Sequence, residues 1–199
     1  MDSQLTPLQS RVLTLLAGLE WTLTGGGALV GFHLGHRTTR DLDLFWHGRA
    51  QLDELPREVE RRLRAAGLGV ENIQSAPAFR RLRVSDGVEL LPLDLVAEPI
   101  PWVDAPVEVL PGILVDTAQE ILTNKLTALL SRWAVRDLVD VRALVAAGAD
   151  LDRALADAPR KDAGFSPPTL AWVLSTLPTV ELDAELLAFR AALIERLAP

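Results

Sequence analysis

The sequence predicts an α/β (α+β) protein in which a mixed β-sheet is followed by a C-terminal region built only of helices. Over residues 1–116, short apolar runs typical of strands alternate with amphipathic helical patterns. From residue 117 to residue 199 only helical periodicity remains. A chain of 199 residues is long enough for a compact core with a helical appendage. We therefore expect an α/β core over 1–116 and a helical region over 117–199.

The core elements follow from periodicity and from the residues that end each run. Glycines close three apolar or amphipathic stretches, and the Asp86-Gly87 pair predicts a hairpin turn. The four prolines within residues 99–111 predict an extended connector or an edge segment of the sheet. We expect helices over 7–19, 28–34 and 52–66, and strands over 21–24, 41–46, 69–75, 79–84 and 88–96.

The helical region shows clear start signals. Thr117 and Glu120 have the spacing of a capping box, and Ser166 stands before Pro167 as an N-cap before a first-turn proline. We expect helices over 117–131 and 137–147, two shorter ones beginning near residues 150 and 167, and a last one over 183–197.

Composition excludes several classes of protein. The chain has no cysteine, so disulfides, thiolate metal sites and cysteine nucleophiles are excluded. No basic stretch leads into an apolar run at the N-terminus, and charges interrupt every apolar stretch before it could cross a bilayer. We expect a cytoplasmic protein without membrane contact. The net charge of −7 argues against a generally basic nucleic-acid-binding surface, and we interpret the arginines over 57–64 and 80–83 as solvated helix and strand faces.

The acidic pair Asp41 and Asp43 is the first sign of chemistry. Two residues apart on a strand, both carboxylates point to the same side. They repel each other unless a cation lies beside them, and hard oxygen ligands suit Mg²⁺ or Mn²⁺. Taken alone, the pair fits an acidic exposed strand face equally well.

The neighbours of this pair favour a phosphate site. The three glycines at 25–27 follow a strand and precede a helix, which lets backbone N–H groups approach a phosphate. Arg37 and Thr39 then lead into the two acids, adding a cation and a hydroxyl. A two-metal site needs a third acid, and Asp94 is the best candidate because it interrupts an otherwise apolar strand; a hydrogen-bonded or salt-bridged core aspartate is the alternative.

These residues resemble the first motif of the AbiEii/AbiGii nucleotidyltransferase toxin family, within the DNA polymerase β-like nucleotidyltransferase superfamily. The motif covers Gly26-Gly27, Ala28-Leu29, Arg37, Thr39 and the DLDLF run at 41–45. A second family element, a helical lysine followed by Arg-Asp-x-x-Asp, resembles Lys125 and Arg136 to Asp140. The resemblance spans about residues 20–147.

The resemblance implies a fold, a reaction and roles. The fold is a polymerase-β-like core, and the reaction moves a nucleoside monophosphate from an NTP to an acceptor hydroxyl with Mg²⁺ or Mn²⁺. The implied roles are metal binding and catalysis for Asp41, Asp43 and Asp94, phosphate contact for Gly26, Gly27, Arg37 and Thr39, triphosphate contact for Lys125, and support from Asp137. For Asp140 a helix-surface salt bridge is an equal alternative.

The same resemblance implies a toxin with a cognate antitoxin protein, acting on RNA such as tRNA. Two alternatives stay open: transfer to a small aminoglycoside-like molecule, and a catalytically silent module that binds a nucleotide or a partner. The oligomeric state and the role of residues 150–199 have no signal in the sequence.

Overall fold

The computed structural model describes residues 4–132 and 134–198. The chain divides into two compact units, Met1–Thr117 (unit 1) and Ala118–Pro199 (unit 2), and each is described by itself. In the part of the chain that the structure describes, no helix combines the length and apolar composition needed to cross a membrane.

Unit 1 is built on a seven-stranded mixed sheet with the strand order β3-β4-β5-β2-β1-β7-β6. The pairs β1–β7 and β2–β5 are parallel and the other four are antiparallel. The strands are β1 (Thr22–Thr24), β2 (Leu42–His47), β3 (Gly69–Ala76), β4 (Phe79–Ser85), β5 (Leu90–Glu98), β6 (Val107–Leu110) and β7 (Ile113–Val115). The mixed sheet confirms the predicted fold class, and β6, which falls in the proline-rich segment, is an edge strand.

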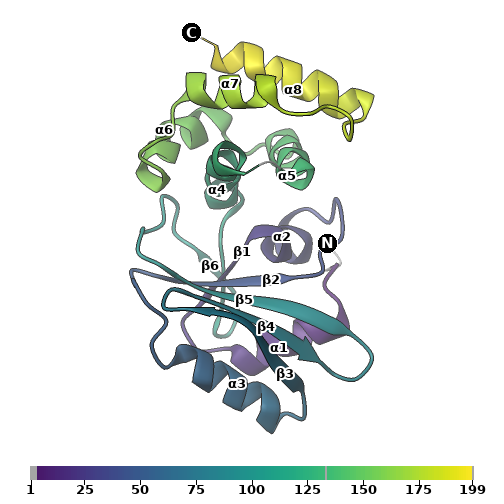
Figure 1. Cartoon of the computed structure of the whole chain (residues 1–199), viewed down its shortest axis with the longest axis vertical. Helices are drawn as coiled ribbons and strands as arrows, with labels where there is room; N and C mark the ends of the chain where they lie inside the picture. Colours follow the sequence, from purple (N-terminus) through teal and green to yellow (C-terminus); the bar gives the residue numbers. More distant parts are fainter. Residues whose placement is uncertain (1–3, 133, 199) are drawn as a thin grey trace. The chain divides into compact units, whose positions relative to one another are not determined.

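Helices cover the sheet of unit 1 (Figure 1). α1 (Pro7–Leu16) and α3 (Leu55–Ala65) lie on one face. The inward pleat of the central strands is fully apolar, with Leu42 and Leu44 of β2 and Leu93 and Leu95 of β5 at 0% exposure. The opposite pleat of the same strands carries Asp43 and Asp94.

The glycine-rich turn differs from the prediction. The expected helix over 28–34 begins earlier, because Gly25 to Gly27 themselves form the first turn of α2 (Gly25–Ala28). The chain then continues as the π-helical segment η1 (Leu29–His33). Glycine is needed here because an added Cβ at each of the three positions would lie within 3.0 Å of another side chain.

The described residues of unit 2 form five helices, and the cap predicted at Ser166 is confirmed. The hydroxyl of Thr117 donates to Oδ2 of Asp104 at 2.5 Å, so the capping box at Thr117 stays a prediction, and α5 begins at Val135, two residues earlier than expected. α6 (Leu151–Lys161), α7 (Pro167–Thr176) and α8 (Ala184–Leu197) are each capped by a side chain, those of Asp150, Ser166 and Asp183 respectively. α4 (Ala118–Ser131) and α5 (Val135–Ala146) precede them. Packing of α4 against α5, α6 and α7 forms the core of this unit.

Candidate active site

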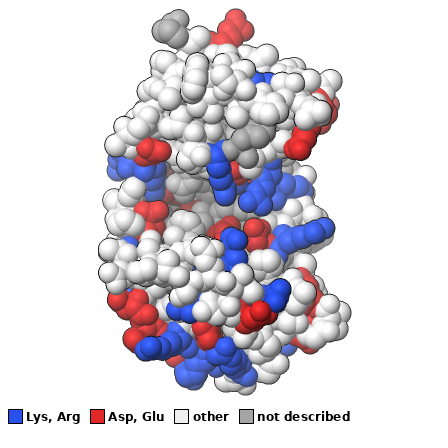
Figure 2. All heavy atoms as spheres, in the orientation of Figure 1, with Lys and Arg blue, Asp and Glu red and all other residues white. Residues whose placement is uncertain are grey.

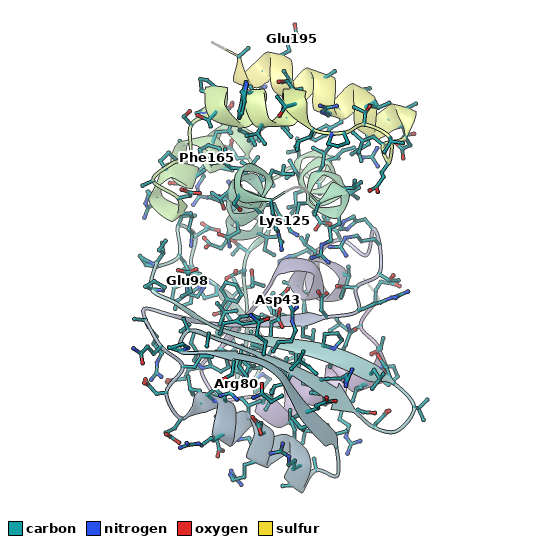
Figure 3. The ribbon with its side chains drawn as sticks, in the orientation of Figure 1. Asp43, Arg80, Glu98, Lys125, Phe165 and Glu195 are labelled. Carbon is teal, nitrogen blue, oxygen red and sulfur yellow. The ribbon has the colours of Figure 1, made fainter. Side chains whose placement is uncertain are left out.

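Two of the predicted acids are neighbours on adjacent strands. Asp43 on β2 lies in register with Asp94 on the parallel strand β5, and Figure 3 labels Asp43 within the sheet of unit 1. Asp94 is buried, and Asp43 is half-buried. Asp41 lies one residue before β2 begins. The sheet therefore brings Asp43 and Asp94 together through tertiary pairing, which sequence spacing alone could not establish.

The glycine turn packs directly against these acids. Gly25 has a φ of +61°, and a Cβ there would lie 2.7 Å from Oδ2 of Asp43. A Cβ on Gly26 would lie 2.8 Å from Oγ1 of Thr39. On Gly27 it would meet the side chain of Leu42 at 2.9 Å. The turn thus fits closely around the protein's own side chains, while phosphate contact by Gly26 and Gly27 stays a prediction.

Thr39 links the turn to the first acid. Its hydroxyl donates to Oδ1 of Asp41 at 2.7 Å, and the residue is buried. Its backbone carbonyl accepts from Nε2 of Gln9 on α1 at 3.1 Å. Nη2 of Arg37 would lie 3.1 Å from a Cβ on Gly26, so this guanidinium also stands beside the turn. Arg37, Thr39, Asp41 and the glycines therefore form one cluster in unit 1.

Arg81 is the residue of this cluster that the sequence analysis missed. From β4 it donates Nε and Nη2 to Oδ1 and Oδ2 of Asp94, at 2.7 and 2.6 Å. The hydrogen bond and charge of Asp94 raise the pKa of Arg81 above its usual value, and the charges of Asp43 and Asp41 add to this effect. The arginines over 80–83 are therefore not all members of a solvated strand face.

The three acids offer carboxylate oxygens, the ligands that Mg²⁺ and Mn²⁺ prefer. Within residues 4–132 and 134–198, no three His, Asp or Glu side chains are grouped as a metal site. Asp94 is bound instead to the Arg81 guanidinium, a cation that feels the field of all three carboxylates. In their chemistry, the carboxylate oxygens of Asp41, Asp43 and Asp94 fit a divalent cation.

The arginines over 57–64 bear out the solvated-face interpretation. Arg57, Arg61, Arg62 and Arg64 each pair with a glutamate three or four residues away, within or just before α3. Figure 2 shows basic and acidic side chains interleaved over α3, at the bottom of the view. Each of these arginines is thus engaged by a glutamate of the same segment.

The predicted residues of unit 2 form a second cluster, around Lys125 of α4 (Figure 3). Its Nζ lies 2.6 Å from Oδ1 of Asp137 and 2.8 Å from Oδ2 of Asp140, both on α5. Both carboxylate side chains have 0% exposure, and that of Lys125 has 9%. Nε of Arg132 lies 3.3 Å from Oδ2 of Asp137. The surface salt bridge considered for Asp140 is wrong, because this carboxylate is completely buried on the inner side of α5.

Unit 1 thus has a mixed-sheet fold in which a strand–glycine turn–helix unit packs onto acids of two adjacent strands. Solved structures with that fold resemble the chain. The nucleotidyltransferase toxin MenT4 from Mycobacterium tuberculosis has a TM-score of 0.66 at 18% identity, over 96% of this chain and 80% of that one. JHP933 from Helicobacter pylori has a TM-score of 0.62 at 21% identity, over 96% and 88%.

The family is shown by the sequence itself. Residues 11–197 match the model of the nucleotidyl transferase AbiEii toxin family of type IV toxin–antitoxin systems. The chain belongs to this family, and it is thereby a nucleotidyltransferase. No curated protein matches the chain significantly.

Proposed function

We propose that this nucleotidyltransferase moves a nucleoside monophosphate from an NTP to a hydroxyl of an RNA, with Mg²⁺ or Mn²⁺ bound at its carboxylates. The observation that carries the proposal is the packing of Asp43, in register with Asp94, against the turn at Gly25. A nucleotide phosphate seated on that turn would meet acids, a hydroxyl and a guanidinium within one cluster.

The roles proposed for the residues follow this geometry. Thr39 orients Asp41 through its 2.7 Å hydrogen bond, and the backbone beside Gly26 and Gly27 supplies N–H donors to phosphate. Arg37 adds a guanidinium that can bind phosphate oxygens in pairs. Divalent metal, when held by Asp41, Asp43 and Asp94, would neutralise phosphate charge and make the acceptor hydroxyl more acidic.

We propose a part in the same reaction for the helical region over 117–199. Lys125 is assigned to the triphosphate as a point charge. Asp137 and Asp140 hold its ammonium group at 2.6 and 2.8 Å, which restricts the side chain to one position. Asp137 is accordingly proposed as a positioning residue for Lys125.

We propose that the acceptor is a short RNA end, such as the 3′ end of a tRNA. Because the chain belongs to a toxin family, the proposed acceptor is a molecule whose modification stops growth. The net charge of −7 does not favour a broad RNA footprint, because RNA binding over a long path depends on basic residues. A cognate antitoxin protein and a cytoplasmic location belong to the same proposal.

The test is a transfer assay. The protein is incubated with Mg²⁺ or Mn²⁺, each labelled NTP in turn, and total tRNA, with an aminoglycoside in parallel. We expect label on RNA and none on the aminoglycoside. Label only on the small molecule would replace the RNA proposal by the alternative acceptor, and NTP binding without any transfer would indicate a silent module.

Asp43→Asn tests the assignment of the acids. It removes the charge at β2 with little change in volume, and we expect transfer to fall by about 10²- to 10³-fold, the usual cost of removing a group that stabilises transition-state charge. Asp53→Asn is the matched control, because Asp53 is exposed on a loop. Full activity of Asp43→Asn would disprove the assignment. Expression of the wild type, but not of Asp43→Asn, is expected to slow growth.

A further inference from the structure

Arg81 holds both oxygens of the predicted third metal ligand. The carboxylate of Asp94 accepts hydrogen bonds from Nε of Arg81 at 2.7 Å and from Nη2 at 2.6 Å. This bidentate geometry makes arginine–carboxylate pairs strong. The register of β4 against β5 places the two residues opposite each other. A carboxylate engaged on both oxygens cannot bind a metal without giving up at least one of these bonds.

The position of Arg81 allows its guanidinium to move away from Asp94. Its side chain is 46% exposed, whereas that of Asp94 is only 11% exposed. The guanidinium stacks 5.6 Å from the centre of the Phe79 ring on the same strand. Arginine stays charged at any physiological pH, so it supplies a constant positive charge that is tethered to the site by its own side chain.

We propose that Arg81 is a tethered counter-ion that competes with divalent metal for Asp94; this inference rests on the proposed metal site of Asp41, Asp43 and Asp94. Without metal, the guanidinium keeps three neighbouring carboxylates from repelling one another. When metal binds, Arg81 releases Asp94 and turns toward solvent. The strength of the ion pair between Arg81 and Asp94 thereby sets the metal concentration at which Asp94 joins the metal site.

The test measures binding of Mn²⁺ alone to the whole chain, from the electron paramagnetic resonance signal of free Mn²⁺. Arg81→Gln removes the competing cation, and we expect Mn²⁺ to bind about tenfold tighter, which corresponds to the loss of one moderately strong charged pair. Arg81→Lys keeps the charge but loses the paired donors, so its affinity should lie between those of the wild type and Arg81→Gln.

Arg83→Gln is the matched control. Arg83 lies two residues along β4, on the same side of the strand, and pairs with Glu71 of β3 instead of with an acid of the site. We expect this variant to bind Mn²⁺ like the wild type. If Arg83→Gln tightened binding as much as Arg81→Gln, the effect would be one of general charge, and the proposal would be overturned.

The outcomes separate this inference from the proposed function. Equal or weaker Mn²⁺ binding by Arg81→Gln, with the wild type binding normally, overturns the role of Arg81 and leaves the metal site standing. If neither the wild type nor Arg81→Gln binds Mn²⁺ at millimolar concentration, both proposals fail. A thermal melt gives a second readout: metal-free Arg81→Gln should unfold at a lower temperature than the wild type, and saturating Mn²⁺ should raise its melting temperature by more.

Discussion

Replacing Lys125 by methionine is expected to destabilise the protein as well as to reduce its activity. The lysine Nζ lies 2.6 and 2.8 Å from carboxylates of Asp137 and Asp140, whose side chains have 0% exposure. Methionine fills the same space without charge, so two buried anions lose a shared cation. Removing one partner of a buried ion pair costs about 3–5 kcal/mol, because the remaining charge is left without compensation.

The expected loss is large compared with the stability of a domain. Arg132 offsets part of it, but this side chain is 57% exposed and lies 3.3 Å from Asp137, so solvent screens its contribution. Native domains have total stabilities of roughly 5–15 kcal/mol. Lys125→Met should therefore leave the helical unit marginally folded, and loss of activity by this variant alone would not prove a catalytic role.

The assay is urea unfolding followed by circular dichroism at 222 nm, which reports mainly on helices. A second variant, Lys161→Met, separates stability from catalysis. Lys161 pairs with the buried carboxylate of Glu120 at 2.5 Å in the same unit, and no catalytic role is assigned to it. We expect Lys161→Met to destabilise the protein but to keep the turnover of the folded fraction, whereas Lys125→Met should lose both.

A double variant tests the cause of the instability. Asp140→Asn in the Lys125→Met background removes one of the two uncompensated charges, and we expect it to recover about 0.5–3 kcal/mol, the usual size of coupling between contacting residues. Two results would refute the reasoning: a loss below about 1 kcal/mol for Lys125→Met, the scale of exposed pairs, or a further loss on adding Asp140→Asn.

Two further predictions concern unit 1. Gly25→Ala should lower transfer by about 10- to 100-fold without unfolding the protein, because its Cβ would press on the Asp43 carboxylate 2.7 Å away. Gly48→Ala has a similar φ of +73° but meets no atom within 4 Å, so it should show only the backbone strain in a thermal melt; equal activity of the two variants would contradict the contact argument. Hydrogen bonds from Arg61 and then Arg62 lower the pKa of Glu58 to about 2 from the usual 4.5. The stabilisation from this lowered pKa is present above pH 4.5 and is lost as the pH falls toward 2, so the difference in melting temperature between the wild type and Arg61→Gln should vanish over that range. An unchanged difference at pH 2 would show that the pair acts through packing.

Much of the fold could be predicted because its signals are local. The cap at Ser166 starts its helix as expected, since a cap depends on residues three positions apart, and the helices expected from near Asp150 and Asp183 also begin there. The position of the glycine turn was predicted correctly, but the sequence did not predict that the three glycines form the first turn of α2. Their close approach to Asp43 and Thr39 involves residues more than ten positions along the chain.

The residues of the candidate site likewise fall into those that the sequence could predict and those that it could not. Asp41, Asp43, Asp94 and Lys125 could be chosen from residue type and spacing, helped by the family motif. Arg81 could not, because its partner depends on the length of the β4–β5 turn. A two-residue turn at Asp86-Gly87 would pair Ser85 with Val88 and place Phe79 opposite Asp94. The structure pairs Ser85 with Leu90, and Asp86 accepts the N–H groups of Val88 and Glu89 within the longer turn.

The sequence by itself determined which residues can carry the chemistry and which local elements present them. Alternation predicted the strand that carries Asp43, and periodicity placed Lys125 on a helix. Only the tertiary structure decided which charges meet. Cross-strand register brought Arg81 to Asp94, and helix packing buried Asp137 and Asp140 around Lys125. The physical reason is that local preferences act over a few residues, whereas the pairing of buried charges depends on distances that the complete fold sets.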